Sequence, residues 1–375
     1  MRIFVFFVVT LPVDMTTLYV FNPEHDIALA SDLANFTAPH AGRQLRADLG
    51  FLPLLWADAG DSVWADNTEF AAKAWHKFLR RTGSLWKKPR FSKDRAALLR
   101  GKQDFHSGNG KEFTCISPWG WDKALKSELI RRGFDAQVMP TDAELEHIRQ
   151  LSHRRTSARL LPHLQMQGVV GEAFECTQAD EVRALLEHYG QVVMKAPWSS
   201  SGRGLRFLSR ERTPFEQQER WFRHLVERQG SVMVEPFYNK VKDFGMEFHA
   251  DGNGGIRYEG LSLFHTANGA YIGNILATEK TKREMISAYI PNGCLDVIQQ
   301  KIMAALHLGN YAGPFGVDMM VVAGNDGFLL HPCVEINLRR TMGHVALTLT
   351  PDDDEVVRVM RIELTDNYQL KINKL

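Results

Sequence analysis

Cysteine is scarce in this sequence, and the few cysteines are not paired in motifs. The 375 residues include 4 cysteines, and no two of them form a CxxC motif. A zinc site and a disulfide framework are therefore not indicated, because both need cysteines at short, regular spacings. This usage favours a reducing compartment, and we predict a cytoplasmic protein. The scattered positions are Cys115, Cys176, Cys294 and Cys333.

An excess of charge of one sign is also absent. The chain has 45 Lys and Arg against 44 Asp and Glu, a net charge of +1, and shows no basic stripe. Nucleic acid is therefore not expected as a partner. The length is sufficient for two or three domains or subdomains, each with a buried core.

No hydrophobic run reaches the length that crosses a bilayer, so no membrane partner is expected. Ile3–Val13 is apolar and superficially resembles a signal peptide. It is too short to span a membrane, and no small-residue cleavage site follows it. Two interpretations stay open for residues 1–14: an upstream start or non-native extension, which we favour, and a secretion signal. Met15 begins a segment that is typical of a first β-strand.

The pattern of expected elements changes along the chain, without repeats or low-complexity tracts. Residues 15–145 alternate short apolar strands with helices, which predicts an α/β domain with a parallel sheet. A charged helix is expected over Thr141–Leu161. Residues 146–231 are expected to form a small lobe. Residues 232–375 are rich in strands and Gly turns, which predicts an antiparallel α+β lobe. A ligand would then lie between the two sheet-bearing lobes.

A β-hairpin expected near the C-terminus carries oxygen ligands. Its first strand contains Asp318, its turn spans Gly324–Gly327, and its second strand contains Glu335 and Asn337. The midpoint of the two carboxylates falls within the turn, so we expect them to lie opposite or nearly opposite each other. Asn337 shares the face of Glu335, because strand side chains alternate. This set suits Mg²⁺, with Mn²⁺ as an alternative. Taken alone, a solvated acidic pair explains the hairpin equally well.

A lysine at the end of another expected strand precedes a loop rich in Ser and Gly. The strand is Gln191–Lys195, and the loop includes Ser199–Gly204. Backbone N–H groups and hydroxyls of such a loop can donate to phosphate oxygens. The segment is neither a Walker loop nor a dinucleotide fingerprint. A plain hairpin turn is the alternative, and the lysine directly before the loop favours a phosphate cover.

A third segment is an apolar strand that ends in an acid, a proline and two aromatic residues. It spans Val232–Tyr238 and includes Glu235. The exposed backbone and apolar side chains of such a strand end can accommodate an adenine ring. Pro236 has no N–H, so the donor would be Tyr238 or its neighbour. A strand that simply runs into a loop is the alternative.

In order and spacing, these three segments resemble the ATP-grasp superfamily over roughly residues 150–345. In that family two α+β lobes hold ATP between them, and the usual reaction ligates a carboxylate to an amine through an acyl phosphate. The resemblance implies an α/β pre-ATP-grasp domain followed by an α+β ATP-grasp fold, with ATP and Mg²⁺ as cofactors. It implies an ADP-forming ligase whose partners are a small-molecule carboxylate and amine, one of them amino-acid-like or peptide-like.

The resemblance also implies roles for single residues. Glu235 is similar to the hinge carboxylate near the adenine amino group, Tyr238 supplies a backbone group to the base, and Asp243 is similar to the acid for the ribose. Arg154 stands where the family commonly has lysine, which keeps the charge and changes the geometry. The full nucleotide-binding set is Arg154, Lys195, Ser199, Ser200, Ser201, Gly202, Gly204, Glu235, Tyr238 and Asp243.

The metal and catalytic residues follow from the same resemblance. Asp318, Glu335 and Asn337 match the metal ligands. Arg339 and Lys195 are the expected catalytic residues, with Arg339 facing the transferred phosphate or the acyl group. Two rival functions stay open: an ATP-grasp kinase that phosphorylates a small molecule, and an ATP-binding module without catalysis.

Turns of the front domain are the expected substrate end, because ligands of open α/β sheets gather where strands lead into helices. Glu24, His25 and Trp119 lie at such turns and are candidates for acceptor recognition. Helix capping and core packing are the favoured alternative for them. The substrates are not specified by these residues, and a homodimer is an open alternative to a monomer.

Overall fold

The computed structural model describes residues 16–86, 91–101, 104, 113–199, 204–267 and 270–374. Residues 1–14, for which two interpretations were open, lie outside these ranges. Four residues of the expected phosphate loop, Ser200, Ser201, Gly202 and Arg203, also lie outside the described residues.

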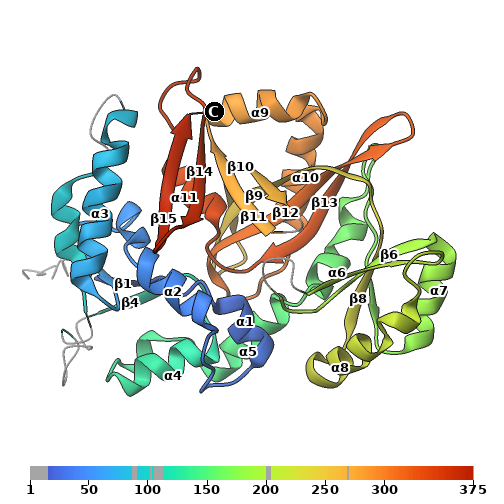
Figure 1. Cartoon of the computed structure of the whole chain (residues 1–375), viewed down its shortest axis with the longest axis horizontal. Helices are drawn as coiled ribbons and strands as arrows, with labels where there is room; N and C mark the ends of the chain where they lie inside the picture. The colour runs from blue at the N-terminus through green and yellow to red at the C-terminus, as the bar shows by residue number, and fades with distance from the viewer. Residues whose placement is uncertain are drawn as a thin grey trace, which may run out of the picture.

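The front part of the chain forms a parallel sheet flanked by helices, as the alternation of strands and helices predicted (Figure 1). The strand order is β3-β2-β1-β4, and the pairings are parallel. Side-chain caps fix two helix starts, since Asn67 accepts from the Phe70 N–H and Asp122 from the Leu125 N–H. The strands are β1 (Thr17–Val20), β2 (Ser62–Trp64), β3 (Leu99–Arg100) and β4 (Cys115–Pro118), and the helices are α1 (His25–Ser31), α2 (His40–Leu49), α3 (Thr68–Thr82) and α4 (Lys123–Arg131).

Two helices, rather than the single one expected over Thr141–Leu161, connect the front domain to the lobes. They are α5 (Asp142–Leu151) and α6 (Arg155–Leu164). Pro162 lies inside α6, close enough to its end that only a late backbone hydrogen bond is lost. The break between the helices puts Arg154 at the N-terminal end of α6.

The small lobe is an antiparallel sheet with the order β5-β8-β6-β7. Its last strand pairs with both β5 and β6, so the sheet extends to Pro236, beyond the expected end of the lobe at residue 231. This corrects the predicted boundary between the lobes. The elements are β5 (Phe174–Cys176), α7 (Ala179–Tyr189), β6 (Gln191–Lys195), β7 (Leu205–Ser209), α8 (Glu219–Gln229) and β8 (Val232–Pro236).

The large lobe is built on a longer antiparallel sheet with the order β13-β12-β9-β10-β11-β14-β15. Long hairpins form it, as the Gly-rich turns predicted. Its strands are β9 (Lys240–Asp251), β10 (Ile256–Ala267), β11 (Ala270–Leu276), β12 (Ala312–Gly324), β13 (Gly327–Asn337), β14 (Arg358–Leu364) and β15 (Tyr368–Lys374), and its helices are α9 (Glu279–Ser287), α10 (Asn292–Ala305) and α11 (Met342–Thr348). The predicted class, an α/β front domain followed by two α+β lobes, is confirmed.

The hydrophobic cores do not follow the boundaries between the three sheets. One core joins front-domain side chains such as Trp75 to α11, β14 and β15, through residues such as Val345 and Leu370. Figure 1 shows β14 and β15 beside α2 and α3. The small lobe has a separate core of its own, which includes Phe215 and Phe222. The front domain is therefore built together with the end of the chain, whereas the small lobe is packed as an independent body.

Two expectations drawn from composition concern membrane-spanning segments and disulfide bonds. Within the described ranges, no helix combines the length and the apolar character that a membrane crossing requires. Cys115, Cys176, Cys294 and Cys333 are all free thiols.

Candidate active site

The hairpin of β12 and β13 holds the two predicted carboxylates opposite each other. Asp318 pairs with Glu335 across the two strands. Nearer the turn Met320 pairs with His331, and continuing that register would put Cys333 opposite Asp318. An irregularity between Asp318 and Met320 shifts the register and brings Glu335 there instead. The predicted pairing is therefore reached through a local irregularity that the symmetry of the turn did not reveal.

Asn337 and Arg339 extend this cluster towards the front domain. Asn337 Nδ2 donates to Asp318 Oδ2 at 3.0 Å, and Asn337 Oδ1 accepts from Arg339 Nη2 at 2.9 Å. Arg339 also forms a bidentate ion pair with Asp26 on α1, through Nε at 2.8 Å and Nη2 at 2.7 Å. Burial alone would raise the pKa of Asp26, but Arg339 outweighs it, so the pKa is lowered. The front domain thereby positions the predicted catalytic arginine.

Arg154 links the small lobe to the hairpin. Its Nε donates to the Ala196 carbonyl at 3.0 Å, and its Nη2 lies 3.4 Å from Ser199 Oγ, both in the segment that follows β6. The same Nη2 lies 2.9 Å from Glu335 Oε1. Arg154 is buried. One guanidinium therefore contacts both the start of the expected phosphate loop and the expected metal ligand.

Lys195 and Glu235 form a buried ion pair inside the small lobe. Lys195 Nζ lies 2.5 Å from Glu235 Oε2, and β6 and β8, which carry them, are adjacent strands. His331 is close enough to this pair to respond to its charges. Burial, the largest cause, lowers the pKa of His331 to about 4; Glu235 raises it and Lys195 lowers it. Both ring nitrogens of His331 lack a hydrogen-bond partner among the described residues.

Sequence reasoning missed Asp26 as the partner of Arg339, and it missed His331 entirely. His331 could have been found as a candidate, because it lies on β13, the strand that also carries Glu335. Asp26 offered a weaker signal, an acid in the first turn of a short helix.

The other expected nucleotide-binding residues take part in contacts of their own. The Tyr238 hydroxyl accepts from the Glu172 N–H at 3.1 Å, and its ring meets His331 edge-on. Asp243 accepts from Lys240 Nζ at 2.7 Å and from the hydroxyl of Thr266.

Gly204 closes the described end of the phosphate loop. A Cβ at this position would lie 2.5 Å from Ser199 Oγ, so only glycine allows this approach. Its carbonyl accepts from the Ala196 N–H at 2.8 Å, which ties the start and the end of the loop together.

The hairpin cluster suits a divalent cation by its charge and its donor atoms. Burial, followed by the nearby Glu335 and Glu247, raises the pKa of Asp318 to about 8. A cation would relieve this repulsion, and carboxylate and amide oxygens are the donors that Mg²⁺ prefers. In the structure Glu335 Oε1 lies 2.9 Å from Arg154 Nη2, and Asn337 Oδ1 accepts from Arg339 Nη2, so a cation would have to replace these two contacts. The described residues contain no group of three or more His, Cys, Asp and Glu arranged to hold a metal.

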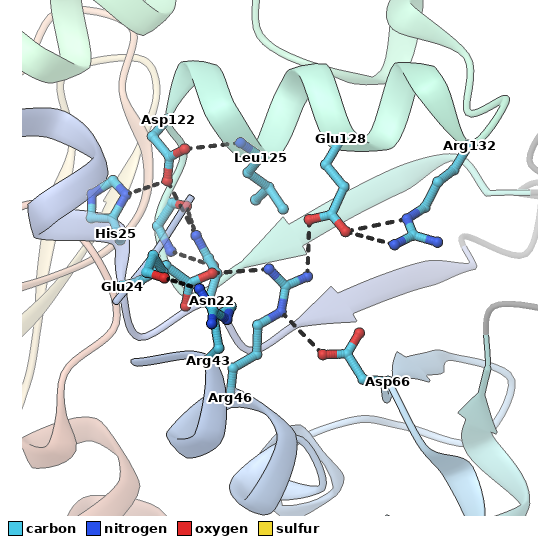
Figure 2. Close-up of polar contacts among 12 residues, drawn as sticks. Asn22, Glu24, His25, Arg43, Arg46, Asp66, Asp122, Leu125, Glu128 and Arg132 are labelled. Carbon is cyan, nitrogen blue, oxygen red and sulfur yellow. Dashed lines mark hydrogen bonds and ion pairs between the residues drawn. The ribbon is translucent and has the colours of Figure 1, made fainter. Parts of the chain in front are cut away.

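The front-domain candidates separate into core and cavity residues. Trp119 is buried and meets Phe21 edge-to-face, with ring centroids 5.0 Å apart. His25 is buried, and its Nδ1 lies 3.2 Å from Asp122 Oδ2 (Figure 2). Glu24 differs from both, because it lines a cavity of about 410 Å³.

Comparison with known proteins gives only distant similarity. No protein-family model and no curated protein match the sequence. Among solved structures, the chain is similar to the N5-carboxyaminoimidazole synthetase of Staphylococcus aureus complexed with ADP, with 12% identity, 93% of this chain and 82% of that chain covered, and a TM-score of 0.49. It is also similar to the biotin carboxylase domain dimer of the Hydrogenobacter thermophilus 2-oxoglutarate carboxylase, in complex with MgADP, ADP and bicarbonate, with 13% identity, 93% and 75% covered, and a TM-score of 0.48.

A third similar structure is a protein from Archaeoglobus fulgidus assigned to the ATP-grasp superfamily. Its identity to this chain is 11%, with 96% of this chain and 99% of that chain covered and a TM-score of 0.46.

Proposed function

We propose that this chain is an ATP-grasp ligase that uses ATP and Mg²⁺ to join a small-molecule carboxylate to an amine, releasing ADP and phosphate. The observation that carries this proposal is the position of Arg154, which contacts both the segment after Lys195 and Glu335. A cationic group proposed for the phosphates thus lies in contact with a carboxylate proposed for the cation, which supports placing both in one site.

The nucleotide would lie between the lobes. Lys195 and Arg154 would bind its phosphates, under a cover formed by the loop from Ser199 to Gly204. Glu235 and the backbone near Tyr238 would hold the base, and Asp243 the ribose. Lys195 is already buried beside Glu235, so it can exchange this partner for a phosphate oxygen with little movement of the backbone.

Asp318, Glu335 and Asn337 would hold the cation. When bound, Mg²⁺ neutralises charge on the β- and γ-phosphates during phosphoryl transfer. Arg339, fixed by Asp26, would stabilise the negative charge that develops on the transferred group.

The chemistry needs no nucleophilic side chain. The substrate carboxylate attacks the γ-phosphorus, the bond to the β-phosphate oxygen breaks, and ADP leaves. The amine then attacks the acyl carbon of the acyl phosphate, phosphate leaves, and the amine loses a proton. The protein supplies positioning, charge and exclusion of water. The free cysteines support the assignment of this reaction to a reducing cytoplasm.

Glu335→Gln tests the proposal in an assay of ADP release over paired amino acids, dipeptides and small carboxylates. The variant is expected to lose turnover by at least about a hundredfold, since one charged ligand is removed, while its circular dichroism is unchanged. Glu363→Gln, on β14 and paired with Lys371, is the matched control and should keep full activity. Unchanged activity of the Glu335 variant would refute the metal assignment.

The products distinguish ligation from the rival functions. A ligase requires both a carboxylate and an amine, and hydroxylamine traps its intermediate as a hydroxamate. A phosphorylated product formed without any amine would identify a kinase. Nucleotide binding without turnover over the whole panel would identify a binding module.

A further inference from the structure

A cavity in the front domain is lined by none of the residues of the proposed nucleotide site. It has a volume of about 410 Å³ and is bounded by α2, α4 and the turn between β1 and α1. This volume is in the range of small-molecule sites. Figure 2 shows its polar side chains converging between the helices. The lining includes four carboxylates and four guanidinium groups: Glu24, Asp66, Asp122, Glu128, Arg43, Arg46, Arg131 and Arg132.

The cavity lies at the carboxyl ends of the parallel strands, which is where open α/β sheets bind ligands. Strands β1, β2 and β3 follow one another outwards in one direction, and β4 lies on the other side of β1. The order in which strands are added to the sheet therefore reverses between β1 and β4, which makes this place the topological switch point of the sheet. Glu24 follows the carboxyl end of β1, Asp66 that of β2 and Asp122 that of β4. Ligands of such sheets bind outside the carboxyl ends of the strands at this switch point.

Arg46 forms the fixed centre of the cavity wall. Its Nη1 lies 2.9 Å from Glu24 Oε1 and its Nη2 lies 3.2 Å from Glu128 Oε2. Glu128 is held in turn by Arg132 Nη2 at 2.7 Å. The guanidinium groups of Arg132 and Arg46 lie 4.6 Å and 5.7 Å from the ring of Trp64. The side chains of Arg46 and Glu24 are only 14% and 11% exposed, so this network is a built and largely dehydrated surface.

Two groups of the cavity have unmet polar capacity: the second oxygen of Glu24, whose first oxygen pairs with Arg46, and the guanidinium group of Arg43. Glu24 Oε2 is buried and has no hydrogen-bond partner among the described residues. Such an atom costs free energy unless a donor reaches it. Burial raises the pKa of Glu24, so a cationic donor would also help to keep it ionised. Arg43 is exposed and donates through Nη1 to the Ala38 carbonyl at 2.6 Å, and no carboxylate in the described parts of the chain pairs with it.

We propose that this cavity binds a small zwitterion, whose protonated amine is held by Glu24 Oε2 and whose anionic group, a carboxylate or a phosphate, is held by Arg43. Ala28, Phe36 and Leu125 supply the apolar wall for the carbon chain between the two groups. The site goes beyond the proposed ligase function, because the front domain alone forms it and binding requires no nucleotide.

Calorimetric titration of the full-length chain without nucleotide tests the proposal with matched probes. 4-Aminobutyrate and phosphoethanolamine carry both groups, whereas butylamine and butyrate carry one each. At least one zwitterion is expected to bind roughly tenfold or more tightly than either single-group probe, as one charged hydrogen bond implies. The tighter zwitterion identifies the anion as carboxylate or phosphate. Failure of both zwitterions to bind more tightly than butylamine and butyrate would overturn the proposal.

Two substitutions assign the groups of the ligand to the two residues. Glu24→Gln should weaken the zwitterion and butylamine alike, by roughly tenfold. Arg43→Gln should weaken the zwitterion and leave butylamine unaffected. Glu128→Gln removes another carboxylate partner of Arg46 and is expected to cost clearly less than Glu24→Gln. Equal losses for these two glutamate variants, or an unchanged affinity in Glu24→Gln, would overturn the assignment.

Nucleotide titration of the same samples separates this proposal from the ligase proposal. Glu24→Gln should bind ATP as the unmodified chain does, which shows that the variant is folded. A chain that binds the zwitterion but not ATP would refute the proposed function and leave this site intact.

Discussion

The ion pair between Asp26 and Arg339 gives the sharpest test of how the front domain supports the active site. Asp26→Asn keeps the shape of the side chain and removes its charge. Arg339 would keep its contact with Asn337 Oδ1 and lose both charged hydrogen bonds to the front domain. We expect a loss of stability and of turnover together, because the same guanidinium holds the domain contact and faces the proposed reaction.

The size of the stability loss follows from the burial of the pair. Removing one partner of a fully buried ion pair costs about 3–5 kcal/mol, and a hydrogen bond to a charged group contributes about 1.5–3 kcal/mol. The side chains of Arg339 and Asp26 are 17% and 19% exposed, so water screens the pair in part. We therefore expect about 2–3 kcal/mol for Asp26→Asn. The control Asp296→Asn removes an exposed ion pair with Arg283 and should cost less than about 1 kcal/mol.

The pH dependence adds a second readout with a definite sign. Because the pKa of Asp26 is lowered in the folded protein, its contribution is complete above the unfolded pKa, about 4. The contribution is lost as the pH falls through the lower folded pKa. The stability difference between the unmodified chain and Asp26→Asn should therefore be constant from neutral pH down to about 5 and shrink below about 4.

Urea unfolding followed by tryptophan fluorescence, repeated over this pH range, measures the difference. Equal costs for Asp26→Asn and Asp296→Asn would show that the pair does not join the domain to the lobe. A difference that persists in acid would refute the lowered pKa of Asp26.

The remaining predictions concern the phosphate contact, the small lobe and the end of the chain. Arg154→Lys should lower kcat/KM for ADP release by about tenfold or more, because a lysine cannot reach the Ala196 carbonyl and Glu335 with one planar group. Phe215→Ala should destabilise the small lobe by about 3–5 kcal/mol and give it an earlier calorimetric transition, whereas Phe207→Ala, at an exposed position, should not. Deleting residues 366–375 should lower hydrogen-exchange protection in the front domain more than in the small lobe, because β15 contributes to the front-domain core.

Local sequence patterns predicted those turns and strands whose formation depends mainly on neighbouring residues. The turn at Gly324–Gly327 and the alternating side chains around it predicted the hairpin, whereas the exact pairing of Asp318 with Glu335 also depends on the irregularity between Asp318 and Met320. The strand ending in Lys195 was equally visible, because an apolar run before a Ser/Gly loop has few alternatives.

Contacts between segments that are far apart in the sequence could not be predicted from local patterns. Asp26 and Arg339 are 313 positions apart, and nothing near either residue specifies the other. The role of Arg154 depends on a break in a charged helical segment that was expected to be continuous. The second helix has no side-chain cap at Arg154, so its start is not distinguishable in the sequence from an ordinary helical turn. Strand β8 was assigned to the wrong lobe because its partners, β5 and β6, are decided by tertiary pairing rather than by its own residues.

The core that joins the front domain to β14 and β15 has a consequence for how the protein is made. Leu370 lies on β15, yet it packs in the same cluster as Trp75 and Phe51 of the front domain. The front domain therefore cannot complete its interior until β15 has been released from the ribosome. The small lobe, whose core is closed within itself, can fold while synthesis continues. Until release, the unfinished apolar face of the front domain is a surface that chaperones can bind.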